Sequence, residues 1–202
     1  MRFLILLALL LASRAEAQSV VNADMAKLQP QIARDAKGFS SCGMRAVVVV
    51  GVKDGHTYDF SVNVYPDSLQ GMIKAGKYRS TAFLSKSASD LKAVLPAPVS
   101  FWFAASDQGV PLKPAQFIPA ETEGFILGST DFSAAFTAIT DMATGKQVQF
   151  AVRYKKEHVD QVVSFSASLS KTDADALAAC FGGLQTRIKS LEASTAAQSS
   201  QN

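Results

Sequence analysis

Histidine, cysteine and tryptophan are scarce in this chain of 202 residues, which contains two histidines, two cysteines and one tryptophan. Histidine and cysteine supply many catalytic bases and nucleophiles and most zinc ligands. The sequence has no His-Glu-x-x-His, Cys-x-x-Cys or Gly-x-Ser-x-Gly motif, so neither a zinc site nor a serine hydrolase elbow can be recognised. These absences predict a protein without a metal or another cofactor.

The chain also lacks a large excess of charge of either sign, because it has 20 lysines and arginines and 17 aspartates and glutamates, which gives a net charge of +3. The basic residues are dispersed along the chain. So small a balance argues against the strongly basic surface that nucleic-acid-binding proteins use. We therefore expect no nucleic-acid partner.

The longest apolar run stands at the start of the chain, and no comparable run follows. Phe3–Ala12 comes directly after Arg2 and shortly before Ala15-Glu16-Ala17. A positive start, a short apolar run and small residues are typical of a signal peptide. About ten apolar residues are too few to cross a bilayer, which needs about 20. We predict cleavage after Ala17 and a soluble protein that is periplasmic or secreted and has no transmembrane segment.

Length and composition divide the chain into three predicted parts. Residues 1–17 are the signal peptide, and residues 18–193 have a length that suits a single domain with its own core. Residues 194–202, "STAAQSSQN", offer no large apolar side chain to bury and are predicted to be a disordered tail.

Period-two patterns predict strands that are joined by hairpins. Within Met44–Tyr65, two runs rich in β-branched and aromatic residues flank Asp54-Gly55, a dipeptide that favours a tight hairpin turn. Lys146–Tyr154 and Gln161–Ser170 alternate apolar and polar residues, which predicts a second hairpin with one wet face. Further strands are predicted in Gly71–Leu84 and Val99–Ala105, and an edge strand or extended loop in Val110–Gly128, which contains three prolines.

Helical spacing predicts a helix that begins at Thr130 or Asp131 and ends before Gly145, and a closing helix that begins at Thr172. The apolar stripe of the first holds Phe132, Phe136, Ile139 and Ala143, and that of the second holds Leu177, Phe181, Leu184, Ile188 and Leu191. Shorter helices are predicted within Val21–Phe39 and at Ser87–Leu95. The predicted fold class is α+β, with a mainly antiparallel β-sheet built from hairpins and packed by a C-terminal helix and the shorter helices.

The two cysteines are candidates for a disulfide bond. Cys180 lies on the apolar stripe of the closing helix, and Cys42 lies in "FSSCGMR", at the entry to the first predicted hairpin. Exported chains with an even number of cysteines usually pair them. We predict a Cys42–Cys180 bond; two free thiols or a catalytic cysteine are the alternatives, and a buried thiol is poorly placed to attack a substrate.

Aromatic and basic side chains on the predicted strands are candidates for a binding surface, since such residues often anchor interfaces. The densest basic segment is Ile73–Arg79, which could equally be a solvated strand face. Trp102 lies between Phe101 and Phe103 and could pack in the core instead. The candidate surface residues are Tyr65, Lys74, Lys77, Tyr78, Arg79 and Trp102.

Binding is the leading functional prediction. We expect a non-catalytic binding or accessory protein of the bacterial envelope or secretome, whose partner is a protein or another envelope component. One alternative is a hydrolase with a dispersed site that uses Glu121, Glu123 or His158, although His158 and His56 are both predicted on hairpin turns and the two glutamates in a loop. The other is a structural envelope or assembly component, which would self-associate.

The C-terminal half has a familiar layout. "GKQVQFAVRY" followed by "DQVVSFSASLSKTDADALAAC" is similar to exported bacterial proteins of the invasion-associated locus B type, in which a Gly-Lys-led strand pairs with a strand that runs into a terminal helix. The resemblance covers Phe125–Leu191 and implies a small periplasmic or surface-associated α+β protein without a known catalytic site. This chain has two cysteines where that family tends to have more, and it lacks the glycine-aromatic step before the helix.

Overall fold

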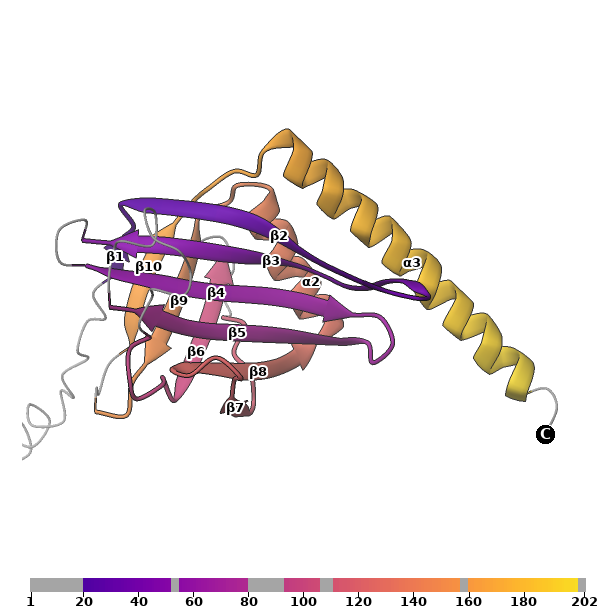
Figure 1. Cartoon of the computed structure of the whole chain (residues 1–202), viewed down its shortest axis with the longest axis horizontal. Helices are drawn as coiled ribbons and strands as arrows, with labels where there is room; N and C mark the ends of the chain where they lie inside the picture. Colours follow the sequence, from indigo (N-terminus) through magenta and orange to yellow (C-terminus); the bar gives the residue numbers. More distant parts are fainter. Residues whose placement is uncertain (1–19, 52–54, 80–92, 106–110, 157–159, 200–202) are drawn as a thin grey trace, which may run out of the picture.

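The computed structural model describes residues 20–51, 55–79, 93–105, 111–156 and 160–199, with side chains described up to residue 194. Within these residues the strands form a six-stranded and a four-stranded sheet, here called the large sheet and the small sheet. Figure 1 shows the strands of the small sheet crossing behind those of the large sheet, with the C-terminal helix running diagonally past the end of the large sheet. The predicted α+β class with mostly antiparallel pairing is confirmed.

The large sheet has the strand order β2-β3-β4-β5-β8-β7, and every neighbouring pair is antiparallel. The predicted first hairpin is formed by β3 and β4, although Asp54 of its turn lies outside the described residues. β7 is a short strand at the sheet edge, where a proline costs no ladder hydrogen bond. The strands are β2 Met25–Asp35, β3 Gly38–Val50, β4 His56–Tyr65, β5 Gln70–Tyr78, β7 Phe117–Pro119 and β8 Phe125–Asp131.

The small sheet has the order β1-β10-β9-β6. The predicted second hairpin is formed by β9 and β10, which pair antiparallel, whereas β1 pairs parallel to β10. The strands are β1 Val20–Asn22, β6 Ser100–Ala105, β9 Val148–Arg153 and β10 Gln161–Phe165.

The helix predicted within Val21–Phe39 is wrong, because Met25–Asp35 is the strand β2, paired along its length with β3. The residues that suggested helical spacing do not share a buried face: Leu28 is buried, while Met25 and Ile32 are 47% and 38% exposed. Pro30, which would interrupt a helix, is accommodated here because β2 is an edge strand.

The helix α2, Phe132–Ala143, has the predicted position, and the Asp131 side chain caps it by accepting a hydrogen bond of 2.7 Å from the backbone N–H of Ala134. The closing helix α3, Lys171–Ser199, continues into the segment predicted as a tail. No helix in the described ranges has both the length and the apolar content that a bilayer crossing requires. Most of the short helix predicted at Ser87–Leu95 lies outside the described residues.

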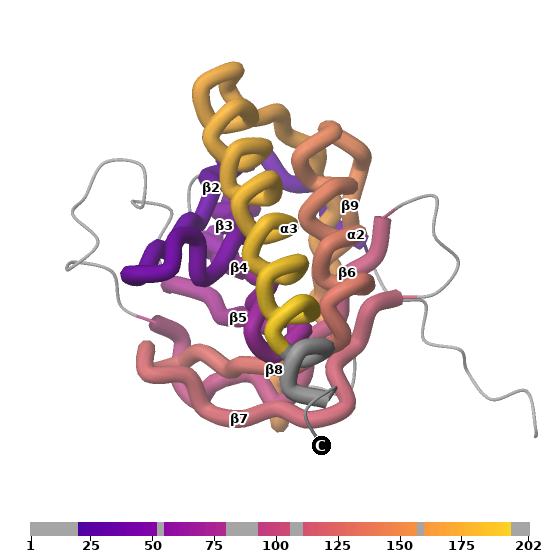
Figure 2. The backbone as a smooth tube through the Cα atoms, turned by 90° about the vertical axis from the view of Figure 1, so that its right-hand side faces the viewer, coloured from indigo at the N-terminus to yellow at the C-terminus, as the bar shows by residue number. Residues whose placement is uncertain are grey.

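The core fills the space between one face of the large sheet and the elements that cover it. At one end the small sheet covers this face, and the ring of Phe60 on β4 stacks on Phe150 of β9 with centroids 4.4 Å apart. At the other end α2 and α3 cover it, and Figure 2 shows these helices running side by side. Gly71 on β5 lets α2 approach closely, since an added Cβ would lie 2.2 Å from the Cβ of Ala135.

The predicted disulfide bond between Cys42 and Cys180 is confirmed. It joins β3 to α3 with a Cα–Cα distance of 5.9 Å, and both cysteines are fully buried. The bond therefore ties the closing helix to the large sheet across 138 residues of sequence.

Candidate binding groove between α2 and α3

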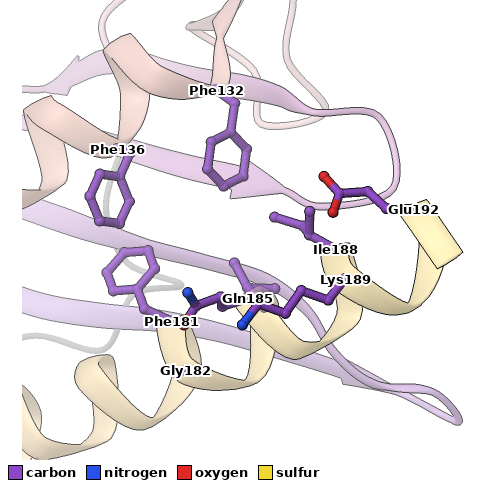
Figure 3. Close-up of a pocket in the computed structure, with 9 residues that line it drawn as sticks. Phe132, Phe136, Phe181, Gly182, Gln185, Ile188, Lys189 and Glu192 are labelled. Atoms are coloured by element: carbon purple, nitrogen blue, oxygen red, sulfur yellow. The ribbon is translucent and has the colours of Figure 1, made fainter.

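α2 and α3 enclose a groove of about 520 Å³ on the surface of the protein. We call it the α2–α3 groove. Figure 3 shows its aromatic side chains facing one another across the gap between the two helices. The lining residues are Phe132, Phe136, Phe181, Gly182, Leu184, Gln185, Ile188, Lys189 and Glu192.

The wall on the α2 side exists because part of the predicted apolar stripe of this helix stays outside the core. Its buried apolar residues are Ala135, Ala138, Ile139 and Met142, whereas Phe136 is 40% exposed. Ala135 sits against Gly71, so the small side chains of α2 face the sheet and its phenylalanines turn towards α3. Of the predicted stripe of Phe132, Phe136, Ile139 and Ala143, Ile139 is buried and Phe132 and Ala143 pack partly against the core, whereas Phe136 is exposed.

Aromatic contacts hold the groove together. The rings of Phe132 and Phe136 are stacked with centroids 6.4 Å apart, and Phe136 meets the edge of Phe181 on α3 at 4.9 Å. Such edge-to-face pairs each contribute about 0.5–1.5 kcal/mol beyond the area that they bury. These contacts fix the relative position of the three rings while part of their surface stays open to solvent.

The wall on the α3 side is the apolar stripe that the sequence predicted. The stripe is buried at Leu177 and at Leu184, which closes the bottom of the groove with 1% exposure. It becomes more exposed as the helix runs past the sheet, and Leu191 is 38% exposed. The stripe therefore begins as core and ends as surface.

Polar side chains line one edge of the groove. Gln185, Lys189 and Glu192 follow one another at steps of four and three residues, which places them on the same face of α3. In Figure 3 the Lys189 side chain runs back along the helix towards the amide of Gln185, near Phe181, while the carboxylate of Glu192 points up from the helix beyond Ile188. The two charged groups thus point to different parts of the groove.

Two anchors hold α3 in place along the groove. The first is the disulfide at Cys180, the residue before Phe181. The second is Arg187, the residue before Ile188, whose side chain is 7% exposed. Because each anchor adjoins a lining residue, the α3 wall is fixed at two points.

Arg187 makes hydrogen-bonded ion pairs with two aspartates. Its Nε donates to Asp67 in the β4–β5 turn at 2.6 Å, and its Nη1 donates at 2.9 Å to Asp35 at the end of β2. These bonds hold the pKa values of both carboxyl groups below their ordinary range and raise the pKa of Arg187. Arg187 therefore connects α3 to the β2–β3 and β4–β5 turns, which lie at the same end of the large sheet.

The candidate surface residues predicted from the sequence do not form one surface. Lys74 and Tyr78 lie on the outer face of the large sheet, where both approach the ring of Phe125. Neighbouring strand residues face opposite sides of a sheet, so Lys77 points inwards and is 5% exposed. Arg79 is exposed just after β5, and Tyr65 is 38% exposed at the other end of β4.

Lys77 is held between the sheets as a buried cation. Its Nζ donates a hydrogen bond of 2.7 Å to Oε1 of Gln161 and lies 4.6 Å from the ring centre of Tyr154. The hydroxyl of Tyr58 donates to the same amide oxygen at 3.0 Å. An amide oxygen and aromatic faces stabilise a desolvated ammonium group, so these contacts allow Lys77 to be buried where the two sheets pack together.

Trp102 is half-buried on the small sheet, whereas Phe101 and Phe103 beside it are core residues. Its indole Nε1 donates a hydrogen bond of 2.7 Å to Oδ2 of Asp160. Arg153 donates to the other oxygen of the same carboxylate at 2.6 Å. Trp102 is thus neither a core residue nor part of the α2–α3 groove.

The outer face of the large sheet carries an ion pair between Arg45 and Asp59. Arg45 donates to both oxygens of Asp59, at 2.9 and 2.5 Å. This bond raises the pKa of Arg45, and burial together with the charge of Asp59 raises the pKa of Tyr78. A shallow polar hollow of about 580 Å³ includes Arg45 and Lys27, and the bidentate pairing with Asp59 neutralises the arginine there.

The residues of the hydrolase alternative are not brought together among the described residues. Glu121 and Glu123 are exposed in the turn before β8, and His158 lies outside the described part. His56 is the first residue of β4 and is half-buried, so its predicted position on an exposed turn is wrong. In the part of the chain that the structure describes, no three histidine, cysteine, aspartate or glutamate side chains form a group suited to a metal ion.

Sequence reasoning assigned the aromatic residues of the groove to apolar stripes. The stripe of α3 extends over Leu177–Leu191, about 21 Å at 1.5 Å per residue, and its last residue, Leu191, is 38% exposed. α3 runs diagonally past the end of the large sheet (Figure 1), and the spacing of the stripe gives no sign of that direction. Comparison with known protein families, with curated proteins and with solved structures found no match to this chain.

Proposed function

We propose that this protein is an exported, disulfide-bonded binding or accessory protein of the bacterial envelope or secretome, and that it binds an apolar ligand in the α2–α3 groove. The observation that carries the proposal is the set of three phenylalanines that face one another in a solvent-open groove. Aromatic surface left in water is costly, and a ligand that covers it recovers about 25 cal/mol per Å² of apolar area.

The size of the groove supports this function. Small-molecule sites have volumes of about 300–1,000 Å³ and are lined mainly by apolar and aromatic side chains, with a few polar groups that orient the ligand. The α2–α3 groove has about 520 Å³ and combines a mostly apolar lining with three polar side chains on one edge. The hollow that includes Arg45 and Lys27 has a polar lining instead.

The rigidity of the groove supports binding as well. Cys180 and Arg187 fix α3 beside Phe181 and Ile188, and the aromatic contacts fix α2 against α3. A site that is formed before the ligand arrives loses less conformational entropy on binding. In this proposal the disulfide acts on function through the position of Phe181.

Export is supported by the signal-like start of the chain and by the disulfide bond, since such bonds persist in oxidising compartments. The test is the intact mass of the protein recovered from the periplasm and the medium of an expressing cell. The expected mass is that of a chain that begins at Gln18. Recovery of the uncleaved chain from the cytoplasm would contradict export.

The binding function is tested with N-phenyl-1-naphthylamine, a neutral apolar fluorophore. We expect saturable fluorescence enhancement with one site per chain. Phe136→Ala should weaken binding by about tenfold, because a buried phenylalanine contributes on the order of 1.5–3 kcal/mol and part of this ring is already covered in the free protein.

The matched control is Ile118→Ala, which removes an apolar side chain that is 55% exposed on β7. This variant should bind the fluorophore like the unaltered protein, and urea unfolding would show that both variants are folded. Equal binding by Phe136→Ala and the unaltered protein, or no binding at all, would overturn the groove as a binding site.

A further inference from the structure

The polar edge of the α2–α3 groove, formed by Gln185, Lys189 and Glu192, indicates the charge of the ligand's head group. Lys189 offers an ammonium group and Gln185 an amide N–H₂, and both are directed to the end of the groove near Phe181. An ammonium and an amide together supply donors for one anionic group. At this end, Figure 3 draws no carboxylate among the labelled side chains.

Glu192, the acidic residue of the lining, is directed to a different place. Its carboxylate rises from α3 beyond Ile188, away from the ammonium of Lys189 (Figure 3). A ligand whose head lies between Lys189 and Gln185 therefore has the phenylalanines and Leu184 of the lining within reach of its tail. The groove is then polar at one end of the ligand and apolar along the rest.

We infer that the α2–α3 groove takes an amphiphile with an anionic head group, such as the carboxylate of a fatty acid, with the head at Lys189 and Gln185 and the tail against the phenylalanines. This inference rests on the proposed function. A small amphiphile fits the groove volume of about 520 Å³, which lies in the range of small-molecule sites. Complementary charge selects an anionic head from amphiphiles with equal tails.

The experiment measures displacement of N-phenyl-1-naphthylamine from the purified, oxidised protein at pH 8. The competitors are dodecanoate, dodecanol and dodecyltrimethylammonium, which share one tail length and differ in head charge. The two ionic amphiphiles are used below their critical micelle concentrations and dodecanol below its solubility limit. Dodecanoate should bind about fivefold more tightly than dodecanol, the effect of one exposed charge pair. Dodecyltrimethylammonium should bind more weakly than either.

The decisive variant is Lys189→Met, which keeps an unbranched side chain shorter by one atom and removes the charge. It should bind dodecanoate and dodecanol equally, with the dissociation constant of the fluorophore measured separately for this variant so that each displacement is converted to an affinity. The matched control is Lys171→Met on the same helix, because Lys171 pairs with Asp175 in the first turn and lies 18 residues away, about 27 Å along the helix axis. It should keep the fivefold preference.

The outcomes distinguish failure of the anionic head group from failure of the groove as a binding site. Fluorophore binding with equal affinity for dodecanoate and dodecanol overturns the anionic ligand and leaves the groove intact as an apolar site. Preference for the cationic amphiphile overturns it too and assigns recognition to Glu192. A dimer in sedimentation that Phe136→Ala dissociates assigns the groove to a second copy of the chain, and absence of all binding overturns the proposed function itself.

Discussion

Removal of the disulfide bond should lower the free energy of unfolding by about 5 kcal/mol. The perturbation is the double variant Cys42→Ala, Cys180→Ala. Alanine is preferred to serine because both positions are fully buried, and a buried hydroxyl would add a desolvation cost. The bond closes a loop of 138 residues, for which the chain-entropy model gives about 5 kcal/mol at 25 °C.

This loss is large against the whole stability of a domain, which is typically about 5–15 kcal/mol. The assay is urea unfolding at pH 7, followed by tryptophan fluorescence, with and without a reducing agent. Without reductant the double variant should unfold at a much lower urea concentration than the unaltered protein. With reductant the two midpoints should nearly coincide, because neither protein then has the bond.

Two results would refute the reasoning. A loss below about 2 kcal/mol would mean that the unfolded chain is already constrained or that the bond distorts the native structure. A gap between the two proteins that persists in reductant would mean that the substitutions themselves, and not the bond, cause the loss. The folded double variant should also bind the neutral fluorophore more weakly, since Cys180 anchors the helix beside Phe181.

Substitution of the neighbouring glycines Gly182 and Gly183 of α3 by alanine should change the free energy of unfolding in opposite directions. Gly183→Ala should destabilise the protein by about 1–3 kcal/mol, because the new Cβ would lie 2.1 Å from a ring carbon of Phe39. The Cβ of Gly182→Ala would meet no atom within 4 Å, so this variant should be more stable than the unaltered protein by about 0.5–1 kcal/mol. Both free energies are measured by urea unfolding, and equal effects of the two variants would contradict the packing described. Arg187→Met should lower the melting temperature at pH 7, and the difference from the unaltered protein should shrink as the pH falls below about 4. Arg187 lowers the pKa values of Asp35 and Asp67 in the folded protein. The two ion pairs therefore stabilise the folded state fully above the pKa of about 3.9 that an aspartate has in the unfolded chain, and this stabilisation is lost as the pH falls and the two carboxylates of the folded protein become protonated. A difference in melting temperature that does not change with pH would contradict this ion-pair role.

The hairpins and the disulfide could be predicted because their signals are local or few. In β9, Val148, Phe150 and Val152 are all buried, as their alternation with polar residues indicated, although Ala151 and Ser164 on the face predicted to be wet are buried too. Alternation predicts a strand with one buried face wherever its partners lie. The pairing of Cys42 with Cys180 needed no geometry, since the chain offers one possible pair.

The sequence by itself therefore determined the period of most apolar segments, with β2 as the exception, and this was sufficient for the α+β class, α2, most of α3 and both hairpins. Only the tertiary structure decided what covers each segment. β2 is a strand because β3 offers it a hydrogen-bonding edge, and Lys77 is buried because Gln161 and Tyr154, from a hairpin much later in the chain, meet it.

The α2–α3 groove depends on the same distinction. Helical spacing shows that Phe136 and Phe181 belong to apolar stripes, but it cannot show how far each helix is rotated or where the sheet beneath it ends. Close approach of Ala135 to Gly71 sets the rotation of α2. Burial is a property of two surfaces that meet, and a sequence pattern describes one of them.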